Sequence, residues 1–125
     1  MNKTIIRELV NTGIWSEQAA HLCERAGHRC EYCGLDFFAS ADNYKQWQED
    51  HIIPQCLGGD NSIDNLAASC RTCNVDLKSR WDPREVAGAT ASREQLVAAV
   101  RQYVSHKRTT ILSDVIRFRI ICDCS

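Results

Sequence analysis

The sequence predicts one small α+β domain, in which a core of short strands and a helix lies between helical segments at both ends. Apolar residues recur at helical spacing before Gly27 and after Ser92. Two Cys-x-x-Cys pairs lie near the two ends of the predicted core. The chain has 125 residues, which is a typical length for a single domain. We expect N-terminal helices over residues 1–28, the core over residues 29–83, and a helical extension and tail over residues 84–125.

The N-terminal segment is predicted to form two helices. Residues 4–12 place apolar side chains along one helical stripe, and Gly13 follows as a stop. Ser16 is a typical N-cap, and Glu17 in the first turn interacts favourably with the helix dipole. We expect the second helix to continue to Gly27 and to lead the chain into the first cysteine pair.

The two cysteine pairs are the candidate ligands of a structural zinc ion. Pairs of thiolates three positions apart can each share one face of a metal, so two pairs supply the four sulfurs of a closed tetrahedral site. A disulfide framework is the alternative, but no secretion signal and no membrane-spanning run is seen. We therefore expect a cytoplasmic protein, whose reducing surroundings favour zinc. The expected ligands are Cys30, Cys33, Cys70 and Cys73.

Between the cysteine pairs we predict a strand, a loop and a second strand. Residues 44–50 can extend as a strand, which Pro54 ends because proline has no amide hydrogen to donate. Turn residues fill positions 58–61, and residues 65–68 return as the second strand. Apolar spacing then predicts a helix from Cys70 or Arg71 to Trp81, before the terminator Asp82-Pro83.

The order and spacing of these motifs resemble the zinc-containing HNH endonucleases. The matching motifs are Cys-x2-Cys, Asp50-His51-Ile52-Ile53-Pro54, Gly58-Gly59, Asn65-Leu66, a second Cys-x2-Cys followed at once by Asn74, and Lys78. The resemblance implies a small ββα-metal core of the HNH or treble-clef-like kind. At the last motif position this chain has asparagine, a variant that the family contains, where the family name has histidine.

The resemblance also implies a role for four residues. His51 takes the place of the general base, and histidine is suited to removing a proton from water near neutral pH. Asp50 and Asn74 take the places of the ligands of a catalytic divalent metal, and their oxygen atoms favour hard ions such as Mg²⁺ or Mn²⁺. Asn65 is expected to hold the two ends of the loop together. A packed core histidine and an ordinary turn asparagine are the alternative interpretations of His51 and Asn65.

The basic residues of the last core helix are the candidate DNA contacts. Lys78, with Arg71 and Arg80, could lie beside the phosphate backbone, although charges on a helix are often only solvated. Net charge is −1, but residues 1–70 carry 5 Lys/Arg against 10 Asp/Glu, whereas residues 71–125 carry 10 against 6. This asymmetry is compatible with one face that meets phosphates.

After the core, residues 84–91 have the composition of a linker. Ser92 and Gln95 form a capping box, which predicts a helix to about Lys107. Residues 109–121 fit a helix by one set of apolar positions and a strand by another, so periodicity does not decide between them. Three further cysteines receive no role: Cys56, Cys122 and Cys124.

Taken together, the motifs predict a metal-dependent HNH endonuclease that cleaves double-stranded DNA with a histidine base and one divalent metal. The alternative is a zinc-stabilised module that binds nucleic acid or protein and has a degenerate nuclease site. A third interpretation makes this chain the nuclease subunit of a larger defence or packaging complex, with a protein partner. None of the three involves a membrane.

Overall fold

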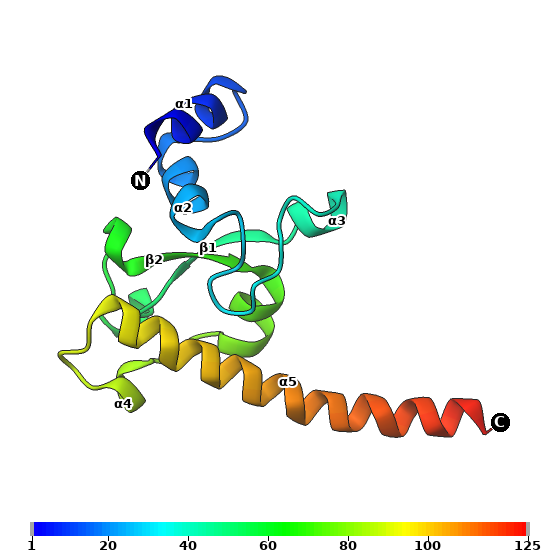
Figure 1. Ribbon diagram of the computed structural model, residues 1–125. Coiled ribbons are helices and arrows are strands. Elements are labelled where there is room, and N and C mark those ends of the chain that lie inside the picture. The colour runs from blue at the N-terminus through cyan, green and yellow to red at the C-terminus, as the bar shows by residue number, and fades with distance from the viewer. Residues whose placement is uncertain (1, 125) are drawn as a thin grey trace.

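The computed structural model describes residues 2–124, and it confirms the predicted α+β class. Two antiparallel strands form the centre, and helices lie on both sides of it (Figure 1). The helical elements are α1 (Lys3–Asn11), α2 (Glu17–Ala26), α3 (Ala41–Tyr44), the π-helix η3 (Thr72–Lys78), α4 (Arg84–Ala87) and α5 (Arg93–Asp123), with the 3₁₀ turns η1 (Gln55–Leu57) and η2 (Ile63–Asn65).

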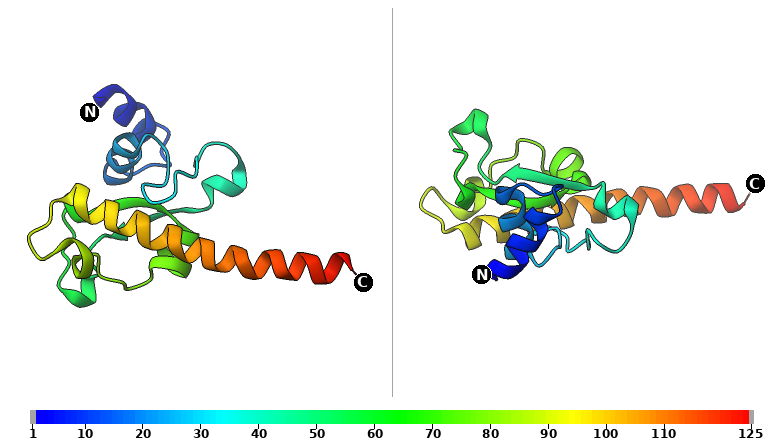
Figure 2. Two further views of the ribbon diagram at one scale, coloured as in Figure 1. Left: turned by 60° about the horizontal axis from the view of Figure 1, so that its bottom comes forward. Right: turned by 90° about the horizontal axis from the view of Figure 1, so that it is seen from above.

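The central hairpin pairs β1 (Trp47–His51) with β2 (Leu66–Cys70), in a register that places Asp50 opposite Ala67. Every residue of β2 is buried. The second N-terminal helix covers one face of the hairpin, and η3 and α5 lie on the other (Figures 1 and 2). This three-layer arrangement buries the apolar centre of the chain, and its largest fully buried apolar side chains include Phe37, Ile52, Val100 and Val104.

The N-terminal helices have the predicted caps. The hydroxyl of Ser16 accepts a hydrogen bond from the amide of Ala19, which satisfies a free donor in the first turn of α2. Gly27 ends the same helix at φ 63°, a left-handed conformation that glycine adopts readily. The chain then turns directly into the first cysteine pair.

The chain that carries the first cysteine pair adds a short extension to the sheet. The amide of Glu31 donates to the carbonyl of Ala68, and a carboxylate oxygen of Glu31 accepts from the amide of Ala68. These two bonds satisfy backbone groups of β2 on the side away from β1. Protein contacts alone therefore hold the cysteine turn against the central hairpin.

Several predicted boundaries were wrong. The strand begins at Trp47 rather than residue 44, because residues 41–44 form the single-turn helix α3. The supposed linker over residues 84–91 contains the single-turn helix α4. Four-residue helices have too few periodic positions to be recognised from apolar spacing.

The last core helix also differs from its prediction, because it ends at Lys78 rather than near Trp81. It is a π-helix, and the amide of Ser79 donates to the carbonyl of Asn74, five residues earlier, at 2.9 Å. Ser79 then has φ 51°, which turns the chain away from the helix axis. The wide turn buries both Leu77 and Lys78, two neighbours that an α-helix would place about 100° apart.

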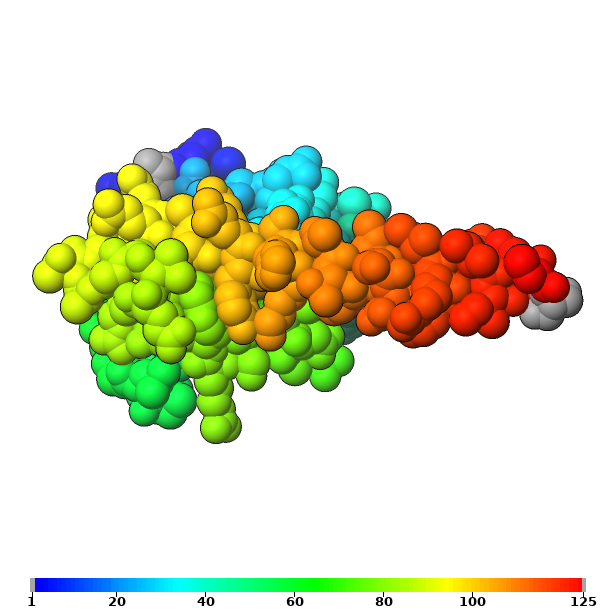
Figure 3. Space-filling view, turned by 90° about the horizontal axis from the view of Figure 1, so that it is seen from below, coloured from blue at the N-terminus to red at the C-terminus, as the bar shows by residue number. Residues whose placement is uncertain are grey.

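The ambiguous residues 109–121 continue α5 as one helix of 31 residues. The stretch contains neither glycine nor proline, and the capping box of Ser92 and Gln95 is present at its start. Its C-terminal part projects beyond the core (Figures 1 and 3). The apolar side chains of that part are exposed: Ile111, Leu112, Val115, Ile116, Phe118, Ile120 and Ile121.

Among the residues that the structure describes, no helix combines the length and the apolar character that crossing a membrane requires.

Candidate active site and zinc site

The four predicted zinc ligands lie together. Cys30 and Cys33 come from the turn after α2, Cys70 ends β2 and Cys73 belongs to η3, yet their four sulfur atoms all lie within 4.8 Å of one another. The sulfurs of Cys33 and Cys70 are 3.6 Å apart. In a tetrahedral zinc site with Zn–S bonds of about 2.3 Å, neighbouring sulfurs are about 3.8 Å apart. The donor set therefore fits a zinc ion.

The chemistry of the four thiols also favours a dication. The pKa of Cys30 lies below its ordinary value because the thiols of Cys33, Cys70 and Cys73 hydrogen-bond to its sulfur. The pKa of Cys73 is raised, first by its hydrogen bond to Cys30. Thiols this close compete to become the thiolate, and a zinc ion ends the competition by binding all four as thiolates. The guanidinium of Arg108, from α5, donates to the sulfur of Cys73 at 3.1 Å, a hydrogen bond that a metal-bound thiolate at this position would strengthen.

Asp50 lies on β1 with its carboxylate turned into the protein, where the residue is 6% exposed. The hydroxyl of Tyr32 donates to its Oδ2 at 2.7 Å, and the ammonium of Lys78 lies 3.1 Å from the same oxygen. Burial raises the pKa of Asp50, while the charge of Lys78 and the Tyr32 hydrogen bond act to lower it. Oδ1 has no hydrogen-bond partner among residues 2–124, so it is the oxygen left for a cation.

Asn74 faces the same side of β1 as Asp50. Its side-chain amide donates to Oε1 of Gln48 at 2.7 Å, and residues 48 and 50 share a face because strand side chains alternate. The structure therefore brings the two predicted metal ligands to one side of the strand. A carboxylate oxygen and an amide oxygen are ligands that hard divalent ions accept, so the donor chemistry fits such an ion, with the Lys78 ammonium as a competing cation.

His51 ends β1 with its side chain on the opposite face from Asp50, as alternation predicts. Its Nε2 lies 2.8 Å from Oδ1 of Asn61, an oxygen that also accepts a hydrogen bond from Gln55. No hydrogen bond joins the imidazole to Asp50 or Asn74 within residues 2–124, but the imidazole is close enough for its charge to lower the pKa of Asp50. A proton acceptor thus flanks the side of the strand that carries the oxygen ligands.

Asn65 ties the ends of the loop between the strands. Its Oδ1 accepts from the amide of Ile53, and its Nδ2 donates to the carbonyls of Ile53 and Asp60. This is the arrangement that the resemblance implies for Asn65. The arrangement also requires a glycine at position 59. A Cβ there would lie 1.8 Å from the Ile53 carbonyl oxygen and 2.9 Å from Nδ2 of Asn65.

Lys78 requires a correction. It was expected to contact DNA, but the residue is only 1% exposed, and its ammonium is bound to Asp50 and to the backbone carbonyl of His51 at 3.1 Å. The wide turn of η3 directs Lys78 into the hairpin instead of towards solvent. Arg71 and Arg80, the other two expected contacts, are both exposed.

Three residues of the site were missed in the sequence: Tyr32, Gln48 and Asn61. Tyr32 stands between the zinc cysteines, where an aromatic residue is easily taken for simple packing. A buried tyrosine usually has a hydrogen-bond partner, so its hydroxyl was the available signal. Gln48 shares a strand face with Asp50 by its position two residues earlier, which alternation could have revealed. Asn61 lies in a turn, and nothing in its spacing points to His51.

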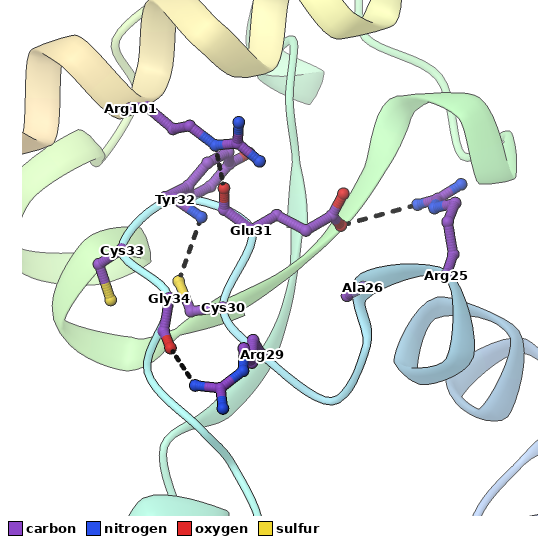
Figure 4. Close-up of a pocket in the computed structure, with 9 residues that line it drawn as sticks. All are labelled: Arg25, Ala26, Arg29, Cys30, Glu31, Tyr32, Cys33, Gly34 and Arg101. Carbon is purple, nitrogen blue, oxygen red and sulfur yellow. Dashed lines mark hydrogen bonds and ion pairs between the residues drawn. The ribbon is translucent and has the colours of Figure 1, made fainter.

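The cysteine turn is held rigidly from two sides (Figure 4). Arg101 of α5 donates to the carbonyl of Glu31 at 2.6 Å, and Arg29 donates to the carbonyl of Gly34 at 3.2 Å. The Glu31 carboxylate is paired with Arg93 at 2.9 Å and lies 3.9 Å from Arg25. These contacts fasten the turn to α2 and α5. Arg25, Arg29 and Arg101 also line a cavity of about 490 Å³ beside the cysteine cluster.

Comparison with known proteins supports the motif assignment. The family model described as HNH endonuclease matches residues 30–87, from the first zinc-site cysteine to the end of α4. No curated protein and no solved structure matches the chain. The match contains Asp50, His51, Asn65 and Asn74 along with all four clustered cysteines, and it confirms the family resemblance drawn from the motifs.

We predict that Cys70→Ser unfolds the core. Zinc binding in small structural sites supplies on the order of 10 kcal/mol of apparent free energy to folding, and a serine hydroxyl is a poor replacement for a thiolate. Zinc content by elemental analysis and the melting temperature by circular dichroism measure the effect. Cys56→Ser is the matched control, because Cys56 is exposed and outside the cluster. The zinc assignment would be contradicted if wild-type protein, purified from cells grown with adequate zinc, contained no zinc by elemental analysis.

We also predict that Lys78→Met lowers the free energy of unfolding by about 3 kcal/mol, because it leaves the Asp50 carboxylate buried without its cation. Chemical denaturation measures the change, with Lys45→Met as a control at an exposed lysine. The double variant Lys78→Met/Asp50→Leu should recover part of the loss, since it removes both charges. A loss for Lys78→Met no larger than that of the control would show that the ion pair is not stabilising.

Proposed function

Because residues 30–87 belong to the HNH endonuclease family, we propose that this protein hydrolyses phosphodiester bonds of double-stranded DNA. One observation carries the proposal: the oxygen ligands of Asp50 and Asn74 lie on one side of β1, and the imidazole of His51 lies at the end of the same strand. A pure binding module has no need of a base beside two hard-metal ligands.

In the proposed reaction His51 takes the proton from the attacking water. Oδ1 of Asn61 accepts a hydrogen bond from Gln55 and therefore acts as an acceptor towards His51 as well. The proton of the neutral imidazole then lies on Nε2, and Nδ1 keeps the lone pair that a general base needs. Asn61 acts as a positioning residue in this scheme, because it selects the tautomer of the base.

The oxygen ligands support a second component of the reaction. A hard divalent ion bound by Asp50 and Asn74 would stabilise the charge that develops on the phosphate and on the leaving oxygen. Asp50 contributes Oδ1, since Tyr32 and Lys78 occupy its Oδ2. Asn74 is a neutral ligand, so the pair favours Mg²⁺ or Mn²⁺ over softer ions.

Arg71 and Arg80 support duplex binding, because both are exposed and lie at either end of η3. Guanidinium groups bind phosphate oxygens without reading the bases, so affinity should fall steeply with salt.

A specific observation favours the alternative of a binding module with a degenerate site. The Lys78 ammonium, 3.1 Å from Oδ2 of Asp50, gives that carboxylate a purely structural role if no metal binds. The exposed apolar part of α5, in turn, favours assembly with a protein partner, because a large contiguous set of exposed apolar side chains is normally covered. The nuclease proposal is compatible with a partner and incompatible with the degenerate site.

The discriminating experiment incubates zinc-loaded protein with supercoiled plasmid and Mg²⁺ or Mn²⁺. The proposal requires nicked or linear product that disappears when a chelator removes the divalent ion. Binding in a gel shift without cleavage under any of these conditions would support the binding module instead.

We predict that His51→Ala lowers the nicking rate by roughly two to four orders of magnitude, the usual contribution of a general base. Zinc content, the melting temperature and gel-shift affinity should stay close to wild type, because His51 is neither a predicted zinc ligand nor a buried core residue. His106→Ala is the matched control, since His106 is exposed on α5 away from the site. Nicking by His51→Ala at the wild-type rate would eliminate His51 as the base.

We predict that Asn74→Ala raises the Mg²⁺ concentration needed for half-maximal nicking, whereas Asn74→His is tolerated with an altered metal preference. Alanine removes the ligand oxygen, and histidine replaces it with an imidazole nitrogen at the same helix position. The measurement is the nicking rate of wild type, Asn74→Ala and Asn74→His as a function of the Mg²⁺ or Mn²⁺ concentration. Identical metal dependence in wild type and Asn74→Ala would remove Asn74 from the metal site.

A further inference from the structure

Tyr32 connects the zinc site to the candidate active site. The residue stands between Cys30 and Cys33, is 4% exposed, and donates its hydroxyl hydrogen to Oδ2 of Asp50 at 2.7 Å. A short hydrogen bond to a buried carboxylate is stronger and more directional than one between neutral groups. The conformation of the Asp50 side chain therefore depends on the position of the cysteine turn.

The turn itself has little freedom to move. The amide of Tyr32 donates to the sulfur of Cys30 at 3.4 Å, and the neighbouring Glu31 is bonded through its backbone to Ala68 of β2 and to Arg101 of α5. Figure 4 shows Arg101 reaching down to the Glu31 carbonyl from the helix above the turn. The sheet, α5 and the sulfur cluster thus all hold the backbone of the turn from which the Tyr32 side chain projects.

We propose that Tyr32 is a positioning residue for the divalent ion that Asp50 would bind. Together with Lys78 it holds Oδ2, from two directions, and leaves Oδ1 as the oxygen that the ion can use. The inference rests on the proposed function, because it assigns Asp50 to the divalent ion. It adds a second task to the cysteine turn, which orients a catalytic-site carboxylate as well as carrying half of the zinc ligands.

The role belongs to the hydroxyl rather than to the ring. The ring packs in the hydrophobic core, a task that phenylalanine can perform equally well. Hydrogen bonds to the ligands of a metal typically change its affinity by about 10- to 100-fold when removed, because the ligand then loses its orientation. Tyr32→Phe therefore separates the positioning role from the packing role.

The test compares zinc-loaded wild type, Tyr32→Phe and Tyr44→Phe. Tyr44 is a matched control, because its ring packs against Trp15 and its hydroxyl makes no hydrogen bond within residues 2–124. Mn²⁺ is the probe, since it gives an electron paramagnetic resonance signal when free and does not compete for thiolate sites. A melting curve of each variant sets a temperature at which all three proteins are folded.

For Tyr32→Phe we expect the Kd for Mn²⁺ and the Mn²⁺ concentration for half-maximal nicking each to rise by about 10-fold. The nicking rate at saturating Mn²⁺, the zinc content and the gel-shift affinity should stay near wild type. Tyr44→Phe should match wild type in every measurement. A selective loss of Mn²⁺ affinity is the signature that packing alone does not produce.

Two results would overturn the inference. If Tyr32→Phe melts at a lower temperature but binds Mn²⁺ as wild type does, the hydroxyl is only structural. If it loses zinc, the hydroxyl acts on the cysteine turn and not on Asp50. Wild-type protein that neither binds Mn²⁺ nor nicks plasmid would instead contradict the proposed function, so the two failures are distinguishable.

Discussion

The convergence of four cysteine sulfurs is the constraint on which the rest of the structure depends. Two of the sulfurs come from the turn after α2, one from the end of β2 and one from η3, so one cluster joins three separate segments of the chain. Fixing these segments fixes both ends of the chain segment that contains the hairpin, and the start of the helix that carries Asn74. A domain of this length has a modest core, and a metal bound by the four sulfurs would compensate for that limit.

The hairpin loop adds a second constraint, which acts on His51. Asn65 bonds the backbone at Ile53 and Asp60, and Gly59 lets the chain approach Ile53 more closely than any side chain would allow. The loop is thereby closed over a short distance, and Asn61 is presented to His51 from within it. The side chains around His51 therefore depend on backbone contacts that lie outside the cysteine cluster.

The sequence allowed the local features to be predicted and left the longer-range ones open. The cysteine spacing, the caps at Ser16 and Ser92, and the alternation of Asp50 and His51 are each set by residues a few positions apart, and the structure contains all of them. The burial of Lys78 depends on a π-turn and on an acid 28 residues earlier, which no local pattern encodes. Residues 109–121 were undecided for a related reason: their large apolar side chains are exposed, so burial in the core does not select one period.

In the proposed nuclease, Lys78 would affect both the stability of the fold and the binding of a metal at Asp50. A buried carboxylate without a cation is costly, so Lys78 stabilises the folded chain before any divalent ion binds. The same ammonium repels a dication at that carboxylate, and the repulsion grows as the local dielectric falls. In the proposed nuclease, a divalent ion at Oδ1 would therefore gain less from Asp50 than from an unpaired carboxylate, and phosphate oxygens of bound DNA would supply the missing negative charge. Tight metal binding would then be coupled to the presence of substrate, because the protein alone would offer one partly neutralised carboxylate and one neutral amide.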